Sequence, residues 1–300
     1  MAVLLFPDIN PYVPLLGPYT FDIGSWRIGP VGVRWYALSY IAGIVLGWRY
    51  GLKLVKTPRL WAPGGPIATP VQIDDLILWL TVGVVVGGRL GSMIFYDPRD
   101  LFTHPLVAFQ IWNGGMSFHG GMIGVGVAIA LFSRANKIDI LRLADLVAPC
   151  VPFGLFFGRI ANFINGELWG RPTHLPWGMV FCNHTLSRPD GSCEAGFAPR
   201  HPSQLYEAAL EGIVLFLILR WATHRARWLP RQGAIVGLFL VSYACFRILL
   251  ENVREPDSWM PKFPLGLTMG MLLSVPMLLA GAWMIWRALK RPIEAAPATS

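Results

Sequence analysis

The distribution of apolar and polar residues along the chain predicts a set of long buried helices. Seven mostly apolar runs are separated by short segments rich in glycine, proline and basic residues. A helix needs about 20 consecutive apolar residues to cross the hydrocarbon core of a bilayer. We therefore expect an all-α, polytopic membrane protein with about seven transmembrane helices. The expected spans are residues 33–52, 74–96, 117–133, 142–163, 204–222, 233–251 and 265–287.

The composition agrees with a membrane protein. Hydrophobic residues make up 54% of the chain and charged residues only 14%, whereas soluble domains average about 25% charged residues. The chain also has 13 tryptophans, a residue that is enriched where helices leave the membrane. We expect one transmembrane domain over residues 1–290 and a short disordered cytoplasmic tail over residues 291–300.

The positions of the basic residues predict the orientation. Of the 25 Lys and Arg residues, fourteen fall in loops on one side of the expected helices, eight on the other side, and three within spans. Cytoplasmic loops carry the excess of basic residues. The N-terminus is therefore expected outside, the C-terminus inside, and residues 164–203 in an extracytoplasmic loop between the fourth and fifth helices. The net charge of +8 then faces anionic lipid, and no nucleic-acid partner is expected.

The long loop contains two of the four cysteines. Cys182 and Cys193 lie in the expected extracytoplasmic loop, while Cys150 and Cys245 lie inside spans. An oxidising compartment permits a disulfide between the loop cysteines, and two free thiols are the alternative. No CxxC motif is present, so a cysteine zinc site is not expected.

Polar residues interrupt the end of the fourth span, in GRIANFINGELWGRP at residues 158–172. If the helix continues through residue 166, Arg159, Asn162 and Asn165 share one face, and Glu167 follows. Buried polar groups are costly unless they are paired or hydrated, so they usually serve a function. The planar guanidinium of Arg159 suits a phosphate group. The alternative is that Arg159 only pairs with Glu167 or a carbonyl and holds helices together.

A second polar face lies in the sixth span. Tyr243, Arg247 and Glu251 follow one another at intervals of four residues and therefore line one side of a helix. The alternative interpretation is a simple ion pair between Arg247 and Glu251 within the helix.

A third polar face begins the fifth span, in RHPSQLYEAALEG. Gln204, Glu207 and Glu211 are spaced so that they share one helix face. The two carboxylates either contribute to a binding site or neutralise Arg247 or Arg159.

The third and first spans also begin with polar residues. His119, in WNGGMSFHGGMIG, is a candidate proton acceptor near neutral pH, although a structural hydrogen bond is the alternative. Tyr36 starts the first span, where tyrosine is also a common membrane anchor. Gly120 and Gly124 form a GxxxG pair, which is an ordinary device for helix packing. A matching stripe of glycines occurs in the second span, at Gly83, Gly87 and Gly91.

All these polar groups fall toward the outer ends of their spans under the expected topology. They predict one polar cavity that is open to the outer leaflet. The chain has no HExxH metal motif, no GxSxG nucleophile motif and no aspartate cluster for magnesium. The cavity therefore suits an anionic lipid headgroup and a group transfer that needs neither a metal nor another cofactor.

Four motifs, in order, resemble those of a known family. The segments GGMSFHGGMIG, GRIANFINGELWGRP, RHPSQLYEAALEG and YACFRILLENVREPD are similar to those of bacterial prolipoprotein diacylglyceryl transferase. The resemblance covers about residues 30–275, and GRIANFINGELWGR is its most specific part.

The resemblance implies a reaction and a location. The diacylglyceryl group of phosphatidylglycerol is moved to the thiol of the lipobox cysteine in a prolipoprotein signal peptide. A thioether forms and glycerol phosphate is released. The enzyme is expected in the bacterial plasma (inner) membrane, with its active site facing the outer leaflet and with membrane lipids around it.

Roles for individual residues follow from the resemblance and from the polar faces together. The expected catalytic residues are His119, Arg247, Tyr36, Asn162 and Glu251. The expected phosphatidylglycerol-binding residues are Arg159, Asn162, Asn165, Glu167, Gly170, Tyr243, Gln204 and Glu207. The group that removes the thiol proton stays open between His119, Glu251 and an arginine-stabilised thiolate.

Two other functions are compatible with a polar intramembrane cavity. A lipid transporter would need a polar path through both leaflets, and the inner halves of the spans are apolar apart from Arg89 and Asp145. An intramembrane protease would need a serine–histidine or paired aspartate site, and the motifs supply neither.

Overall fold

The structure of the protein is a computed structural model. It describes residues 4–23, 26–96, 103, 117–255, 263 and 266–293, without the side chains of residues 23, 26–31, 95, 96, 118 and 119. Most of the expected tail, residues 294–300, lies outside the described residues.

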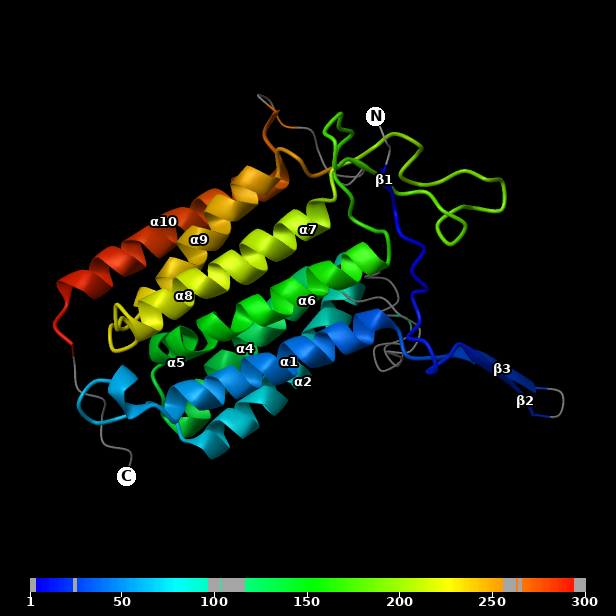
Figure 1. Cartoon of the computed structure of the whole chain (residues 1–300). Helices are drawn as coiled ribbons and strands as arrows, with labels where there is room; N and C mark the ends of the chain where they lie inside the picture. Colours follow the sequence, from blue (N-terminus) through cyan, green and yellow to red (C-terminus); the bar gives the residue numbers. More distant parts are fainter. Residues whose placement is uncertain are drawn as a thin grey trace.

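Each expected span coincides with a helix or with a continuous run of helices, and the boundaries differ by up to four residues. The helices lie side by side, with the N-terminus and the loop after α6 at one end and the C-terminus at the other (Figure 1). A short helix, η1 (Pro58–Leu60), follows α1. The seven units are α1 (Trp35–Val55), α2 (Pro70–Tyr96), α4 (Phe118–Asn136), α5–η4–α6 (Ile140–Val147, Ala148–Cys150, Val151–Ile164), α7–η5–α8 (Ser203–Glu207, Ala208–Val214, Leu215–His224), α9 (Ala234–Leu250) and α10 (Met269–Lys290).

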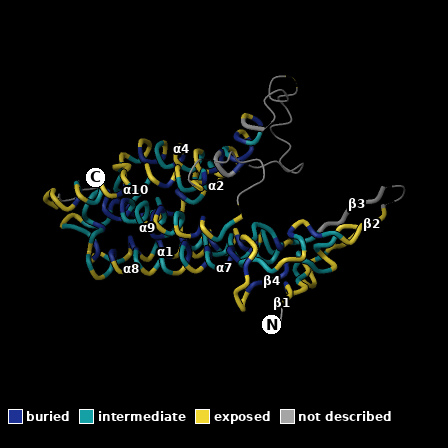
Figure 2. Tube along the Cα trace, turned by 90° about the horizontal axis from the view of Figure 1, so that it is seen from above, coloured by how far each residue is buried: buried dark blue, intermediate teal, exposed yellow. Residues whose placement is uncertain are grey.

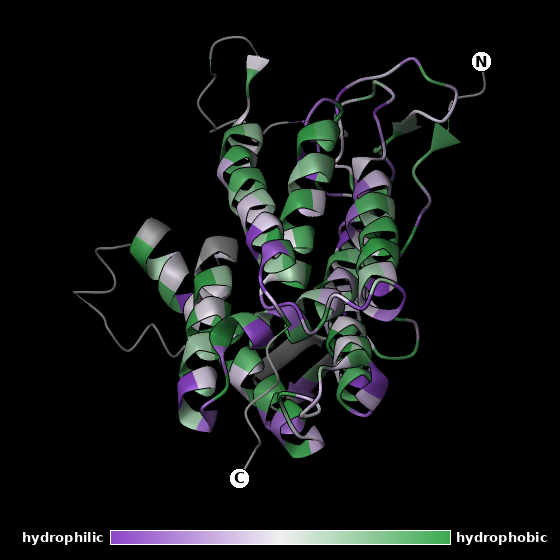
Figure 3. Cartoon of the chain, turned by 90° about the vertical axis from the view of Figure 1, so that its left-hand side faces the viewer, coloured by the Kyte–Doolittle hydropathy of each residue, from purple (hydrophilic) through white to green (hydrophobic). Residues whose placement is uncertain are grey.

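The surface of the helix bundle is apolar. Among the described residues, the helical stretches Pro70–Ile94, Ile140–Ile164 and Met269–Lys290 are long and apolar enough to cross a membrane, and Gly120–Asn136 and Ala234–Leu250 are shorter apolar helices. Large hydrophobic side chains such as Leu78, Leu217 and Leu279 are exposed on these helices. Hydrophobic colours follow the helices in Figure 3, and exposed residues line their outer faces in Figure 2. The chain is therefore a membrane protein.

Short strands outside the helix bundle depart from the all-α expectation. β1 (Leu4–Leu5) pairs in parallel with β4 (Met179–Val180), and β2 (Tyr19–Ile23) pairs antiparallel with β3 (Trp26–Val31). The strands form where the chain leaves the apolar spans, because backbone groups there need partners that no helix supplies.

The loop between α6 and α7 has a small core of its own. Phe6 packs on Phe163 and Phe181, so the N-terminal segment covers the loop. Cys182 and Cys193 are joined in a disulfide, with 5.6 Å between their Cα atoms. The structure therefore selects the disulfide from the two alternatives that the sequence left open. We call residues 165–202 the head.

Glycines allow α2 and α4 to lie in close contact. A Cβ atom on Gly124 would overlap the carbonyl oxygen of Gly83, and one on Gly87 would overlap that of Gly120. The expected packing role of these glycines is confirmed.

At the end of the bundle opposite the head, a buried carboxylate anchors a helix. Asp145 of α5 is fully buried, and its two oxygens accept hydrogen bonds from the backbone N–H groups of Gly233 and Val236 at 2.5 and 2.9 Å. It thereby caps the first turn of α9, where backbone donors lack partners within the helix. Asp145 therefore has a structural explanation and does not need to mark a transport path.

We expect Gly124→Val to destabilise the α2–α4 contact. Overpacking of this kind costs about 1–3 kcal/mol, and here the obstacle is backbone that cannot move aside. Thermal unfolding in detergent would measure the loss. Gly126→Val is the matched control, because a Cβ atom on Gly126 meets no described atom within 4 Å; equal destabilisation by both substitutions would contradict the interpretation.

Candidate functional site

Three arginines from two helices meet at the head end of the bundle. Arg159 lies on the last turns of α6, Arg247 on the last turn of α9, and Arg254 just after α9. Their side chains are 18%, 15% and 14% exposed, respectively. A permanently charged guanidinium needs a partner in such surroundings.

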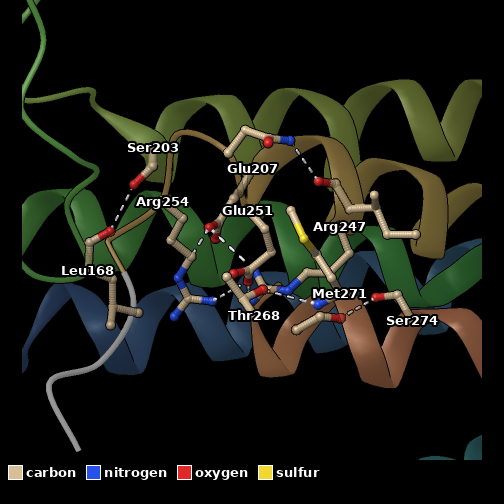
Figure 4. Close-up of polar contacts among 12 residues, drawn as sticks. Leu168, Ser203, Glu207, Arg247, Glu251, Arg254, Thr268, Met271 and Ser274 are labelled. Carbon is tan, nitrogen blue, oxygen red and sulfur yellow. Dashed lines mark hydrogen bonds and ion pairs between the residues drawn. The ribbon is translucent and has the colours of Figure 1, made fainter. Parts of the chain in front are cut away.

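Buried carboxylates supply the partners. Arg159 Nε lies 2.6 Å from Glu207 Oε2, and its Nη2 lies 3.5 Å from Glu211 Oε2. Arg247 Nη2 lies 2.7 Å from Glu251 Oε1. Arg254 is farther away, at 3.9 Å from both Glu207 and Glu251. Figure 4 shows Glu207 and Glu251 with Arg247 and Arg254 beside the start of α10.

Glu207 connects the whole cluster. Its carboxylate lies within 4 Å of all three guanidinium groups, with 3.6 Å to Arg247 Nη1. It precedes the π-helical segment η5, which carries Glu211. Such segments occur often at functional sites. The third polar face therefore neutralises the arginines of the other two faces, which was one of its two expected roles.

The anionic and cationic groups differ in exposure. The Glu207, Glu211 and Glu251 side chains are at most 5% exposed, whereas the side chains of the three arginines are 14% to 18% exposed. Arg247 Nη1 is buried, and although it lies 3.6 Å from Glu207 Oε1 it has no hydrogen-bond partner among the described residues. The arginine side chains are thus the more exposed part of the cluster, and the carboxylates are the more buried part. That arrangement suits an incoming anion.

A second polar group lies beside Arg159 on α6. The side-chain amide of Asn162 donates to Glu167 Oε1 at 2.7 Å and lies 3.4 Å from the Tyr36 hydroxyl. Glu167 is therefore the partner of Asn162, and the expected alternative pairing of Arg159 with Glu167 is wrong. α6 ends at Ile164 with Asn165 as its C-cap, so the helix does not continue through residue 166.

The start of α7 holds the head in place. Gln204 donates to the carbonyl oxygen of Glu167 at 2.6 Å, and Ser203 donates to that of Leu168 at 3.0 Å. Both residues are buried. Gln204 thus fixes the backbone of Glu167, and the described contacts of its side chain are structural.

Gly170 connects the head to Arg254. Its N–H donates to His201 at 2.9 Å, and it forms a β-bridge with Arg254. A Cβ atom here would lie 2.5 Å from the Val253 carbonyl oxygen, so only glycine fits this close approach. Burial lowers the pKa of His201 below its ordinary value.

The remaining expected site residues lie in different surroundings. Tyr243 stacks on Phe239 and is close enough to Arg159 and Glu211 for electrostatic interaction. The side chain of Asn165 makes no hydrogen bond to the described residues. His119 lies in the first turn of α4, and its side chain lies outside the described part of the structure.

Two members of the cluster were not among the expected site residues. Glu211 shared a helix face with Glu207 in the sequence, and Arg254 follows Arg247 by two helical turns. The helical spacing of both residues is visible in the sequence, but only the folded structure shows which residues they contact.

Among the described residues, no group of three or more His, Cys, Asp or Glu side chains is arranged to hold a metal ion.

The fold and the cluster define a class of protein: an integral membrane protein with a cluster of arginines and buried carboxylates near one end of its helices. Comparison with known proteins specifies the family. Residues 24–287 match the family model described as prolipoprotein diacylglyceryl transferase. The chain belongs to this family.

Curated relatives cover almost the whole chain. It is 59% identical over 295 residues to the phosphatidylglycerol–prolipoprotein diacylglyceryl transferase of Phenylobacterium zucineum, covering 98% of each chain. The protein of the same name from Caulobacter vibrioides is 58% identical over 301 residues, covering 97% of each chain. The one from Sinorhizobium medicae is 48% identical over 289 residues, covering 96% of this chain and 95% of its own.

We expect Glu207→Ala to lower stability strongly. Removal of one partner from a buried ion pair costs about 3–5 kcal/mol, and this carboxylate serves three guanidinium groups. Unfolding in detergent would measure the loss. Glu255→Ala is the control, since Glu255 is 45% exposed and pairs with Arg200 at the surface, where a pair contributes about 0–1 kcal/mol. Similar losses in both variants would contradict the central role of Glu207.

Proposed function

We propose that this protein transfers the diacylglyceryl group of phosphatidylglycerol to the thiol of the lipobox cysteine of prolipoproteins. The products are a thioether and glycerol phosphate, and the step is the first in lipoprotein maturation. The observation that carries the proposal is the cluster of three arginine side chains, each partly exposed, that pair with buried carboxylates at the head end of the bundle. The names of the relatives support the two substrates.

The arginines would hold the phosphate of the lipid. Arg159 and Arg247 come from different helices, share Glu207 as a partner and have partly exposed side chains, so they could hold one phosphate between them. The forked geometry of the guanidinium group matches two phosphate oxygens. In a site surrounded by lipid and apolar helices, such contacts are stronger than in water.

The same contacts would assist bond breaking. When the thiolate attacks the glyceryl carbon, the carbon–oxygen bond to phosphate breaks and negative charge grows on the departing oxygen. Cations that are already in position stabilise this charge without reorganisation. Glu207, Glu211 and Glu251 are engaged with the arginines, so we assign them to positioning the guanidinium groups. For Glu207 this replaces the expected direct contact with phosphatidylglycerol.

Asn162, Tyr36 and Glu167 would form the neighbouring part of the site. Asn162 is buried and hydrogen bonded to both partners, which fixes the phenol and the amide beside Arg159. The Tyr36 hydroxyl accepts from Asn162 and can donate its own hydrogen to the lipid, and the Asn162 amide oxygen can accept from a glycerol hydroxyl. Gly170 acts through the backbone, because its bridge fixes Arg254.

The thiol proton still needs an acceptor. Glu251 is 4% exposed and lies 2.7 Å from Arg247, so it is poorly placed to reach a peptide thiol. We favour His119 for this role, since its helix α4 begins toward the head and imidazole accepts protons near pH 7. An arginine-stabilised thiolate is the alternative.

The distribution of basic residues among the loops gives the proposed orientation of the protein in the membrane. We propose seven membrane spans, with the head, the disulfide and the N-terminus outside the plasma membrane and the basic loops inside. The site then faces the outer leaflet. Residues 1–290 form the transferase domain in this proposal.

Release of glycerol phosphate tests the function. Purified protein in detergent with EDTA would be mixed with phosphatidylglycerol and a lipobox peptide. We expect release by the wild-type protein, and a loss of about a hundredfold or more in Arg159→Ala or Arg247→Ala, comparable to removal of one preorganised donor from a transition state.

Two controls make the assay specific. A Cys→Ser peptide should give no release, since the thiol is the acceptor. Arg188→Ala, in the head and outside the cluster, should keep full activity. Release that continues without the peptide thiol, or a well-folded protein that gives none, would refute the proposed transfer.

A further inference from the structure

A loop in the head packs on the turn that ends α6. We call residues 182–193 the disulfide loop, because the cysteines at its two ends are joined. Within it, Ser187 forms an antiparallel bridge with Cys193. The neighbouring Leu186 is partly buried and packs against the small core of the head. Its side chain also covers Gly166, since a Cβ atom on that glycine would lie 2.6 Å from Leu186 Cδ1.

Gly166 turns the chain at the end of α6. Its φ of +66° lies in the left-handed region, which favours glycine. The N–H of Gly166 donates to the Phe163 carbonyl oxygen at 2.9 Å, and the N–H of Glu167 donates to that of Asn162 at 3.1 Å. These two hydrogen bonds are those of a Schellman turn. The turn therefore determines where Glu167 leaves the helix.

In this turn a polar contact replaces the usual apolar one. A Schellman turn is often closed by a hydrophobic contact between the two residues that its longer hydrogen bond joins. Here these residues are Asn162 and Glu167, and the Asn162 amide donates to Glu167 Oε1 at 2.7 Å. Glu167 is partly exposed, and water competes for its hydrogen bonds. The turn therefore depends on an apolar contact from outside, which Leu186 supplies.

The disulfide loop keeps Leu186 in place. The side-chain oxygen of Asn183 accepts from the backbone N–H groups of Thr185 and Leu186 at 3.1 and 3.0 Å. The N–H of Arg188 donates to the carbonyl oxygen of Ser192 at 2.8 Å. A disulfide restricts the freedom of the loop that it closes, so its loss should let Leu186 move away from the turn.

We propose that Leu186 is a positioning residue for the transfer reaction. It holds Glu167 against Asn162, and both of these residues belong to the proposed site. The disulfide between Cys182 and Cys193 acts through Leu186, because it keeps this side chain on the turn. The inference rests on the proposed function and connects the activity to the oxidised state of the head.

Leu186→Ala tests the positioning role. A displacement of about 1 Å in a catalytic arrangement can cost about a hundredfold in rate, and for a smaller shift we expect kcat for glycerol phosphate release to fall about tenfold. Leu186→Met should keep nearly full activity, because this exchange conserves volume. Met179→Ala is the matched control, since Met179 packs against the same small core. It should keep its kcat even where the thermal midpoint falls as much as in Leu186→Ala.

Hydrogen exchange measures whether the turn opens. The Glu167 N–H is protected by its hydrogen bond to the Asn162 carbonyl oxygen, and local opening exposes such groups to exchange. In Leu186→Ala the Glu167 amide should exchange faster than in the wild-type protein. It should exchange at the wild-type rate in Met179→Ala and in Leu186→Met.

A combined variant tests whether the disulfide acts through Leu186. Replacing both loop cysteines, by Cys182→Ser with Cys193→Ser, should lower kcat and speed exchange at Glu167. Adding the same two substitutions to Leu186→Ala should cause little further loss, because residues that act through one contact are not additive. Losses that multiply, or full activity without the disulfide, would overturn its role.

The remaining outcomes are also decisive. Full activity in Leu186→Ala would overturn the inference, and so would equal losses of kcat in Leu186→Ala and Met179→Ala, because the head core as a whole would then be responsible. A lower kcat in Leu186→Ala with unchanged exchange at Glu167 would also overturn it. A wild-type protein that releases no glycerol phosphate would instead refute the proposed function.

Discussion

The ion pairs around Glu207 are the constraint on which the rest of the site depends. One carboxylate, 1% exposed, lies within 4 Å of three guanidinium groups that come from α6, α9 and the segment after α9. Charges in apolar surroundings are tolerated only as partners. The ion pairs with Glu207 therefore fix the position of α7 relative to α6 and α9. They also fix the direction of each arginine side chain.

Close backbone contacts complete this framework. Gly124 lets α4 lie against α2, and Gly170 lets the head lie against the chain after α9. In both places a side chain would overlap backbone atoms.

The helices could be predicted from the sequence because their signal is local. Long apolar runs specify the segments, and their ends moved by only a few residues in the structure. The polar faces were also visible, since Tyr243, Arg247 and Glu251 repeat with the helical period. The β2–β3 hairpin and the core around Phe6 lay outside the apolar pattern, so no prediction covered them.

The sequence alone determined which segments are apolar helices, which residues share a face, and which charges lie among apolar neighbours. Periodicity contains this information because each side chain's direction follows from its place in its own helix. Only the tertiary structure decided the partners. It joined Arg159 to Glu207 and Glu211 rather than to Glu167, and it made Asp145 the cap of α9. Such choices depend on which helices become neighbours, and that is settled by packing between segments far apart in the chain.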